Sequence, residues 1–498
     1  MSRQVSRAAS RDDQELQHFG YRSEFDRIIK PFASFAVSVS NTSITTGVFL
    51  AVGATFAIAG PAGLWVYLID GVAMLFVGLV YATLSARMPV AGIEYQWGTR
   101  LARPAVGLSL GWLSFGTVAV SAVAVDYVLA STVLPALFGY TSSTTGTLFV
   151  CALIIVIQAL ILGASTRLTT LINSGVIVGE LVVVIGLSLL LLIVGAVRHF
   201  LVGHNLTTTS GGSTGSYLAI FGHHGVGPFW LLLSVAFFSI ADGFQGCANV
   251  VEETEDASRV VPRAMMQTLT VTIFVQMFFM ISVVLVSHHL SALADSSTTV
   301  SDVVSALLGT AVDKIFLIFV SFNVFACGMI IFLQATRYTW SMARDGRFPV
   351  ARVFGKISPR TETPVAATTL CLIFLLAILF IFGHSTESFN NLIAAGGLVA
   401  IVTYLLVMLL FAFFGRRIPV PEGRFDLGRW QWPVVGLAVI WLVFCLSIFR
   451  SGFSSAWTYF GGIVGLGVIY VAWVLLAGPG KSSDDSAENP LVADTSLE

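Results

Sequence analysis

Apolar runs of about 20 residues recur along almost the whole chain, with short polar segments between them. As an α-helix, each run is long enough to cross a hydrocarbon core of about 30 Å. The runs are continuous rather than alternating, which favours helices over a β-barrel. We therefore expect an all-α membrane protein with about twelve transmembrane helices, over residues 32–58, 62–84, 106–138, 145–164, 168–197, 228–250, 264–288, 314–342, 364–383, 388–414, 433–450 and 456–477.

The composition supports a membrane protein and gives no reason to expect a nucleic acid, a metal or a cofactor as a partner. Only 11% of the residues are charged, whereas soluble domains carry roughly 25%. The net charge of −1 gives no reason to expect a nucleic-acid partner. The five cysteines lie inside apolar runs without metal-ligand spacing, and the histidine pairs 223–224 and 288–289 are better read as solvated loop residues than as a metal site. We therefore predict no cofactor and no metal.

The distribution of basic residues predicts the orientation. Of the 26 Lys and Arg residues, only Arg198, Lys314 and Arg450 fall on the side opposite the N-terminal tail. Basic loops stay on the cytoplasmic side of a membrane. We therefore expect a multi-pass plasma-membrane protein with both termini in the cytoplasm.

Two spans carry polar and glycine residues at their centres, where an uninterrupted helix is not expected. Span 1 contains residues 40–47, and span 6 contains Asp242 followed by Gly243. Glycine and hydroxyl residues weaken the backbone hydrogen bonds of a helix, and non-helical backbone inside a membrane is tolerated where it lines a cavity. We expect a broken helix at each place, with amides that bind a carboxylate and carbonyls that bind an ammonium group. Tight helix packing by small residues is the alternative.

Four acidic residues lie within the predicted spans, and the sequence indicates no Lys or Arg deep in any span. They are Asp70, Asp126, Glu180 and Asp242. Buried charges in membranes are costly and usually functional. We predict that Asp242 binds the solute and that Glu180 takes part in ion coupling. A structural hydrogen bond is an equal alternative for Asp126, and Asp70 reads as a packing or relay residue.

Span 8 and the loops on the N-terminal side carry further polar groups. Ser321, Asn323 and Gln334 lie in span 8, where they could coordinate an ion beside span 1 or form interhelical hydrogen bonds. The acidic segment 252–258 after span 6 and the segment 341–349 after span 8, which carries Arg344 and Arg347, could form an inner gate of salt bridges. Solvated helix ends are the alternative, since surface ion pairs contribute little.

An ordered set of motifs resembles the amino acid–polyamine–organocation superfamily, and within it the amino acid/choline transporter group. The motifs run nearly from end to end of the chain and comprise Phe19–Tyr21, Ser43–Gly47, Gly60–Gly63, Arg87–Gly92, Tyr95–Trp97, Val125–Tyr127, Leu129–Ala130, Asp242–Phe244, Glu252–Thr254, Ala343–Gly346 and Phe425–Arg429.

The resemblance implies the LeuT-type fold of two inverted five-helix repeats with two added helices. The expected parts are a cytoplasmic tail (1–30), the first repeat (31–200), an extracellular loop (201–227), the second repeat (228–415), two C-terminal helices (416–478) and a second tail (479–498). It also implies that the solute carboxylate is held by Ser43, Ile44, Thr45, Thr46 and Gly47, and its amine by Ile240, Ala241, Asp242, Gly243 and Phe244, with Phe244 as a lid and Asp126 nearby.

The chain departs from the family pattern at several positions. Thr83 stands near a position where members often have Glu, and Gly92-Ile93-Glu94-Tyr95 replaces the usual Gly-Gly-x-Tyr. Glu180 lies near the place of a Lys that some relatives have in span 5, and Gln245 stands where many have an acid.

These features predict a secondary active transporter that moves a small amine-bearing solute, first of all an amino acid, by alternating access, either coupled to a proton or sodium gradient or by exchange. Its expected partners are a small amino acid or amine solute, a proton or sodium ion for coupling at Glu180, Ser321 or Asn323, and the lipid bilayer. Choline, ethanolamine, GABA and polyamines form the alternative solute set. A nutrient sensor that does not transport is the second class. An enzyme ranks last, because the sequence offers no nucleophile–base pair or phosphate loop.

Overall fold

A computed structural model describes residues 12–22, 24–209, 214–220, 225–296, 298–420, 423–452 and 455–477. The described part is helical, and an isolated bridge between Ile29 and Thr254 is the only β-type pairing recorded in it. The first half of the chain forms α2 (Pro31–Thr42), α3 (Ile44–Ile58), η1 (Pro61–Leu64), α4 (Trp65–Arg87), α5 (Ile93–Leu101), α6 (Pro104–Val128), η2 (Leu129–Val133), α7 (Leu134–Phe138), α8 (Thr144–Ala164), α9 (Thr166–Val197), η3 (Gly203–Thr207) and α10 (Thr214–Tyr217).

The second half begins with the short segments α11 (Pro228–Leu231), α12 (Leu233–Ala236), η4 (Phe237–Ala241) and η5 (Gly246–Glu253). It continues with α13 (Ala257–Val286), α14 (Leu290–Ala294), α15 (Thr299–Leu308), α16 (Thr310–Arg344), α17 (Ala351–Phe354), α18 (Val365–Phe382), α19 (Thr386–Phe414), η6 (Gly415–Arg417), η7 (Gly428–Trp430), α20 (Gln431–Gly452) and α21 (Ala456–Ala477).

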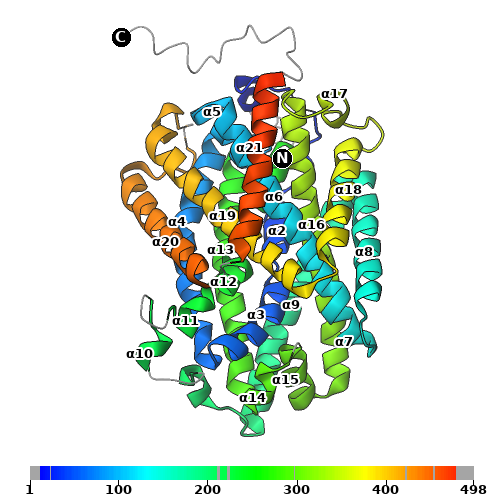
Figure 1. The fold of residues 1–498 in the computed structure, drawn as a ribbon, viewed down its shortest axis with the longest axis vertical. Helices are drawn as coiled ribbons and strands as arrows, with labels where there is room; N and C mark the ends of the chain where they lie inside the picture. Colours follow the sequence, from blue (N-terminus) through cyan, green and yellow to red (C-terminus); the bar gives the residue numbers. More distant parts are fainter. Residues whose placement is uncertain are drawn as a thin grey trace.

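The long helices run roughly parallel to one axis and form a bundle (Figure 1). Within it α4 packs against α13, and α6 packs against α16. The helices α5 and α17 lie at one end, which we call the basic end, and α10, α14 and α15 lie at the opposite end, which we call the far end (Figure 1). Serine caps begin several of these helices; the Ser143 hydroxyl, for example, accepts a hydrogen bond from the Gly146 amide at 3.1 Å.

Ten described helices are long and apolar enough to cross a membrane, and the bent pair Pro31–Phe49 and Ala51–Ile58 raises the number to eleven. The expected sixth span is present as the shorter apolar helix Pro228–Ile240, followed by a break. The all-α membrane architecture is therefore confirmed. The count of twelve and the internal repeat stay predictions.

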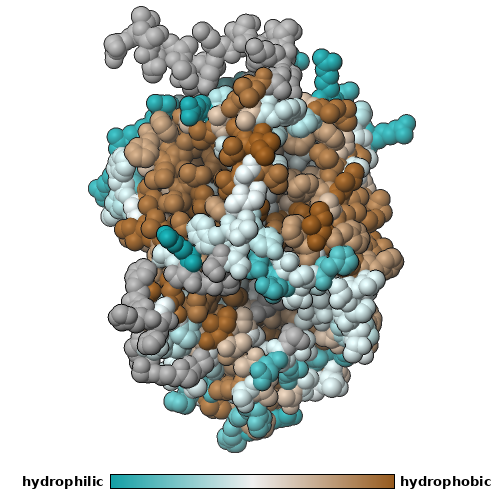
Figure 2. Space-filling model, viewed as in Figure 1, coloured by the Kyte–Doolittle hydropathy of each residue, from teal (hydrophilic) through white to brown (hydrophobic). Residues whose placement is uncertain are grey.

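On the face seen in Figure 2, apolar side chains cover large areas of the bundle, and hydrophilic ones gather at its two ends. Large apolar side chains that are at least two-thirds exposed include Phe149, Leu160, Leu171 and Phe413. Large exposed apolar areas of this kind suit lipid rather than water. The five cysteines are free and buried, as expected of small core residues.

Candidate functional site

Span 1 is broken at Ser43, inside the segment that the sequence indicated. Ser43 separates α2 from α3 and has φ 44° and ψ 93°. A positive φ is strained for a residue with a Cβ atom and occurs most often at functional sites. The Ser43 hydroxyl accepts a hydrogen bond from the Thr46 amide at 3.3 Å and so caps the start of α3.

Span 6 is broken directly after η4. Asp242 is extended, with φ −87° and ψ 146°, and Gly243 has φ 96°. The chain becomes helical again at Gly246, the first residue of η5. Gly243 supplies a backbone conformation that L-residues rarely adopt, so the sharp change of direction beside Asp242 depends on this glycine.

The two breaks lie against each other. The side-chain amide of Asn41 donates a hydrogen bond to the backbone carbonyl of Gly243 at 2.6 Å, and the Ser38 hydroxyl donates one to the backbone carbonyl of Phe244 at 2.8 Å. A Cβ atom on Gly47 would lie 2.6 Å from the carbonyl oxygen of Ser239. Spans 1 and 6 therefore meet through side chain–backbone bonds and a glycine contact.

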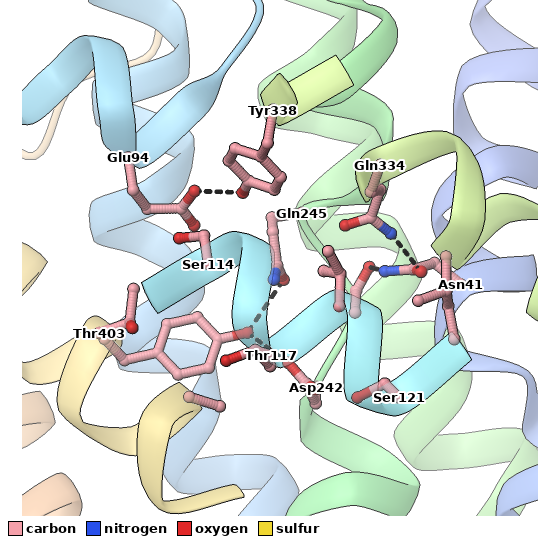
Figure 3. A pocket seen from close by; sticks show the side chains of 15 residues that line it. Asn41, Glu94, Ser114, Thr117, Ser121, Asp242, Gln245, Gln334, Tyr338 and Thr403 are labelled. Atoms are coloured by element: carbon pink, nitrogen blue, oxygen red, sulfur yellow. Dashed lines mark hydrogen bonds between the residues drawn. The ribbon is translucent and has the colours of Figure 1, made fainter. Parts of the chain in front are cut away.

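A small polar cavity lies beside the break in span 6 (Figure 3). Its volume is about 40 Å³, and roughly 10–15 Å³ holds one water molecule in this measure. No Lys, Arg or His is among the described side chains that line it, which are Asn41, Glu94, Ser114, Thr117, Val118, Ser121, Asp242, Gly243, Gln245, Ile331, Gln334, Tyr338, Ala400, Thr403 and Tyr404.

Both acidic groups in this cavity bind phenol hydroxyls. Tyr404 donates to Asp242 at 2.8 Å and lies 3.0 Å from Gln245 Oε1. Glu94 on α5 accepts hydrogen bonds from Tyr81, at 3.1 Å, and from Tyr338. Burial raises the pKa of the Glu94 carboxyl above its ordinary value, and the Tyr338 hydroxyl counteracts the shift by stabilising the charged form.

A larger cavity of about 450 Å³ adjoins the small one and shares Asn41, Ser121, Asp242 and Ile331 with it. It follows α3 from the break to Ile58, toward η1. Most of its lining is apolar, and the described lining contains no Lys, Arg or His. Asp242 is therefore the acid that lines both of these neighbouring cavities.

The predicted binding segments line these cavities only in part. Thr46, Gly47 and Asp242 line the large cavity, and Asp242 and Gly243 line the small one. Neither lining includes Ser43, Ile44, Thr45, Ile240 or Phe244. The Ala241 side chain lies outside the described residues. Phe244 is fully buried between Tyr81 and Tyr404, with ring centroids 5.5 and 6.1 Å away, so its lid role stays a prediction.

Glu180 on α9 reaches the break in span 1. Its Oε1 atom accepts hydrogen bonds from the Thr45 amide, at 2.7 Å, and from the Thr45 hydroxyl. The side chain is buried, and its Oε2 atom has no hydrogen-bond partner in the structure. The backbone amide of Thr45, which the family resemblance implies as a donor to the solute carboxylate, thus donates to a carboxylate of the protein itself.

The other two acids face away from the cavities. Asp126 is fully buried and accepts a hydrogen bond from Gln158 of α8 at 2.8 Å. Asp70 is fully buried and accepts one from the Trp441 indole at 3.0 Å. Neither residue lines either cavity. These contacts favour structural hydrogen bonding for both.

The polar residues of span 8 differ in what they contact. The Ser321 hydroxyl donates to the Leu317 carbonyl and the Asn323 amide to the Phe319 carbonyl, both within α16. Gln334, by contrast, donates to Asn41 of span 1. Gln334 therefore connects span 8 to the break, while a coupling role for Ser321 and Asn323 stays a prediction.

Buried ion pairs join neighbouring segments at the basic end. Arg337 lies inside α16, seven residues before its end at Arg344, is 1% exposed and pairs with Glu253. Arg344 pairs with Glu252 at 2.9 Å. A lone charge is too costly to bury, but a paired one is tolerated. Because Glu252, Glu253 and Arg337 are buried, they are not solvated residues at helix ends, which was the alternative to a gate.

Sequence reasoning missed Tyr404, Asn41 and Glu94 as site residues. Asn41 stood in the polar segment of span 1, and Glu94 stood in a family motif where it was noted only as a departure. Their polarity was visible in the sequence, but their partners lie far away in the chain. Tyr404 gave no signal, because one tyrosine in an apolar helix is ordinary.

Comparison with known proteins adds to this geometry. The family described as "Amino acid permease" matches residues 29–469. The amino-acid permease BAT1 of Arabidopsis thaliana is 25% identical over 455 residues, which cover 86% of each chain. The low-affinity putrescine importer PlaP of Escherichia coli K12 is 29% identical over 355 residues, which cover 70% of this chain and 72% of PlaP. A putative polyamine transporter of Candida albicans is 26% identical over 220 residues, which cover 43% of this chain and 39% of that protein.

Proposed function

Since the chain belongs to the amino acid permease family, we propose that this permease carries a positively charged amine and that the Asp242 carboxylate receives the ammonium group. One observation supports this proposal above the others: Asp242 lies at a break in span 6 and lines two neighbouring cavities whose described linings hold no basic side chain. A buried carboxylate without a cationic partner is costly. An arriving ammonium group supplies that partner.

Amines without a carboxylate fit the site better than α-amino acids. The amides of Thr45 and Thr46 at the start of α3 already bind Glu180 and Ser43. A solute carboxylate at this helix end would meet the negative charge of Glu180. The name of the relative PlaP, a putrescine importer, points the same way, while BAT1 supports an amino acid as the second candidate.

We propose that the structure represents one state in an alternating-access cycle. Ion pairs close the basic end, and the large cavity extends from Asp242 along α3 toward the far end. If the basic end faces the cytoplasm of a plasma membrane, as basic loops do, this state accepts solute from outside. Opening of the Arg337–Glu253 and Arg344–Glu252 pairs then releases it inside.

Glu180 is the proposed coupling group. It joins α9 to the break in span 1, and its Oε2 atom has no hydrogen-bond partner. A proton or a sodium ion at this oxygen would neutralise the carboxylate, which weakens its hold on the Thr45 amide. Loading of the ion thereby changes the break in span 1, which lies against the break in span 6 that holds Asp242.

Counterflow in proteoliposomes tests the proposed function. Purified protein is loaded with unlabelled amine, and entry of labelled amine is measured against the matching α-amino acid. The proposal expects saturable exchange of the amine. Binding without exchange would instead indicate a sensor, and no exchange of any amine or amino acid would contradict the proposal.

A further inference from the structure

The small polar cavity contains a second acid that the proposed role of Asp242 does not use. Glu94 enters it from α5, and Asp242 enters it from the break in span 6 (Figure 3). Glu94 is 2% exposed. It lines the small cavity but not the large one, whereas Asp242 lines both. Because α5 lies at the basic end (Figure 1), a solute bound at Asp242 has Glu94 on the side that faces the basic end.

Two packed tyrosines connect these carboxylates. Tyr81 donates to Glu94 at 3.1 Å, Tyr404 donates to Asp242 at 2.8 Å, and the centroids of the two phenol rings are 5.3 Å apart. Because both rings are held in the packed interior, the two acids have fixed positions in one space. A carboxylate has about four acceptor sites, so Glu94 keeps acceptor capacity beyond its two phenol partners.

The described lining of the cavity supplies no cation that would balance two ionised carboxylates. Two carboxylates share it, and the described side chains around it include no Lys, Arg or His. Two like charges in one low-dielectric space cannot both stay ionised at low cost. A solute with one positive charge compensates one of them, whereas a solute with two positive charges compensates both.

The available space also fits a second cationic group. The small cavity of about 40 Å³ holds about three water-sized centres, which is room for a terminal ammonium group. Serine, threonine and amide side chains around it, such as Ser114, Thr117 and Gln245, offer acceptors for the remaining N–H bonds.

Resting on the proposed function, we infer that Glu94 is a specificity-determining residue that binds the distal ammonium group of an α,ω-diamine whose first ammonium group is bound by Asp242. The preferred solute is then a short aliphatic dication. A structural role for Glu94, in which it only joins α5 to Tyr81 and Tyr338, is the competing account.

Uptake of 1,4-diaminobutane and of n-butylamine separates the two accounts, since these amines have the same chain length and differ by one ammonium group. In the wild-type protein we expect the diamine to have an apparent affinity about tenfold or more above that of the monoamine. In Glu94→Gln, we expect the apparent affinity for the diamine to fall about tenfold and that for the monoamine to stay within about twofold. Asp70→Asn is the matched control, because Asp70 is a buried acid that lines neither cavity.

Each other outcome is decisive. Equal affinities for the two amines in the wild-type protein would overturn the inference without any variant and would leave the proposed function standing. Equal losses for both amines in Glu94→Gln would show that the role is structural and would overturn it as well. Transport of neither amine by the wild-type protein would overturn the proposed function and the inference together.

Discussion

The Oε1 atom of Glu180 accepts a hydrogen bond from the backbone amide of Thr45 at 2.7 Å, although 135 residues separate them along the chain. The bond brings a negative charge to the start of α3, where the broken helix of span 1 begins again. A helix N-terminus stabilises an anion, and here that anion belongs to the protein. Under the proposed function, we expect this relationship to determine which solutes the break in span 1 accepts.

The variant Glu180→Gln tests that consequence. Glutamine keeps the shape and an acceptor oxygen for Thr45 but removes the negative charge. We expect lysine to inhibit the uptake of 1,5-diaminopentane about tenfold more strongly than in the wild-type protein, since the two solutes differ by one carboxyl group. The readout is the inhibition constant. An unchanged constant would show that Glu180 does not exclude carboxylates.

The same variant tests the coupling role. Without an ionisable group next to the break, we expect amine uptake to lose its response to an imposed proton or sodium gradient, while counterflow of the amine continues. Asp70→Asn is the control and should keep the wild-type response. Gradient-driven accumulation by Glu180→Gln at the wild-type level would place the coupling elsewhere.

Gly47→Ala tests the contact between the two breaks. A Cβ atom at Gly47 would lie 2.6 Å from the Ser239 carbonyl, whereas a Cβ atom at Gly175 has no neighbour within 4 Å. Overpacking costs about 1–3 kcal/mol, so we expect Gly47→Ala to lower uptake about tenfold and Gly175→Ala to leave it within about twofold. Equal uptake by the two variants would contradict close packing of spans 1 and 6 at their breaks.

Arg337→Ala tests the closure of the basic end. The change leaves Glu253 buried without its cation, and loss of one partner of a buried pair costs about 3–5 kcal/mol. We expect η5 to loosen, so that the native Cys247, which is fully buried there, reacts with a maleimide added from the basic end. Arg352→Ala on the exposed helix α17 is the control. Cys247 that stays protected in Arg337→Ala would argue against this gate.

Much of the architecture follows from the sequence, because membrane helices are local. Length and hydropathy alone indicate most spans, and the glycine and hydroxyl residues indicate the two breaks at Ser43 and Asp242. The site itself depends on contacts between distant segments. The bond from Tyr404 to Asp242 joins residues 162 positions apart, and the sequence of a single chain gives no sign of such a pair.

Other contacts could not be predicted for the same reason. The sequence did not single out Arg337, because its partner, Glu253, is in another segment, and only their contact makes a buried arginine tolerable. Glu180 was noted for its charge, but its position against the Thr45 amide depends on the packing of α9 on span 1. Residue type indicated that these groups matter, and the fold shows what each one contacts.

Counterflow of labelled 1,4-diaminobutane into proteoliposomes, compared between the wild-type protein and Asp242→Asn, tests the central claim most directly. Asparagine keeps the size of the side chain and an oxygen for Tyr404 but cannot balance an ammonium charge. We predict saturable exchange by the wild-type protein and an apparent affinity at least about tenfold weaker in Asp242→Asn. Equal affinity and rate in the two proteins would contradict the claim that Asp242 binds the amine.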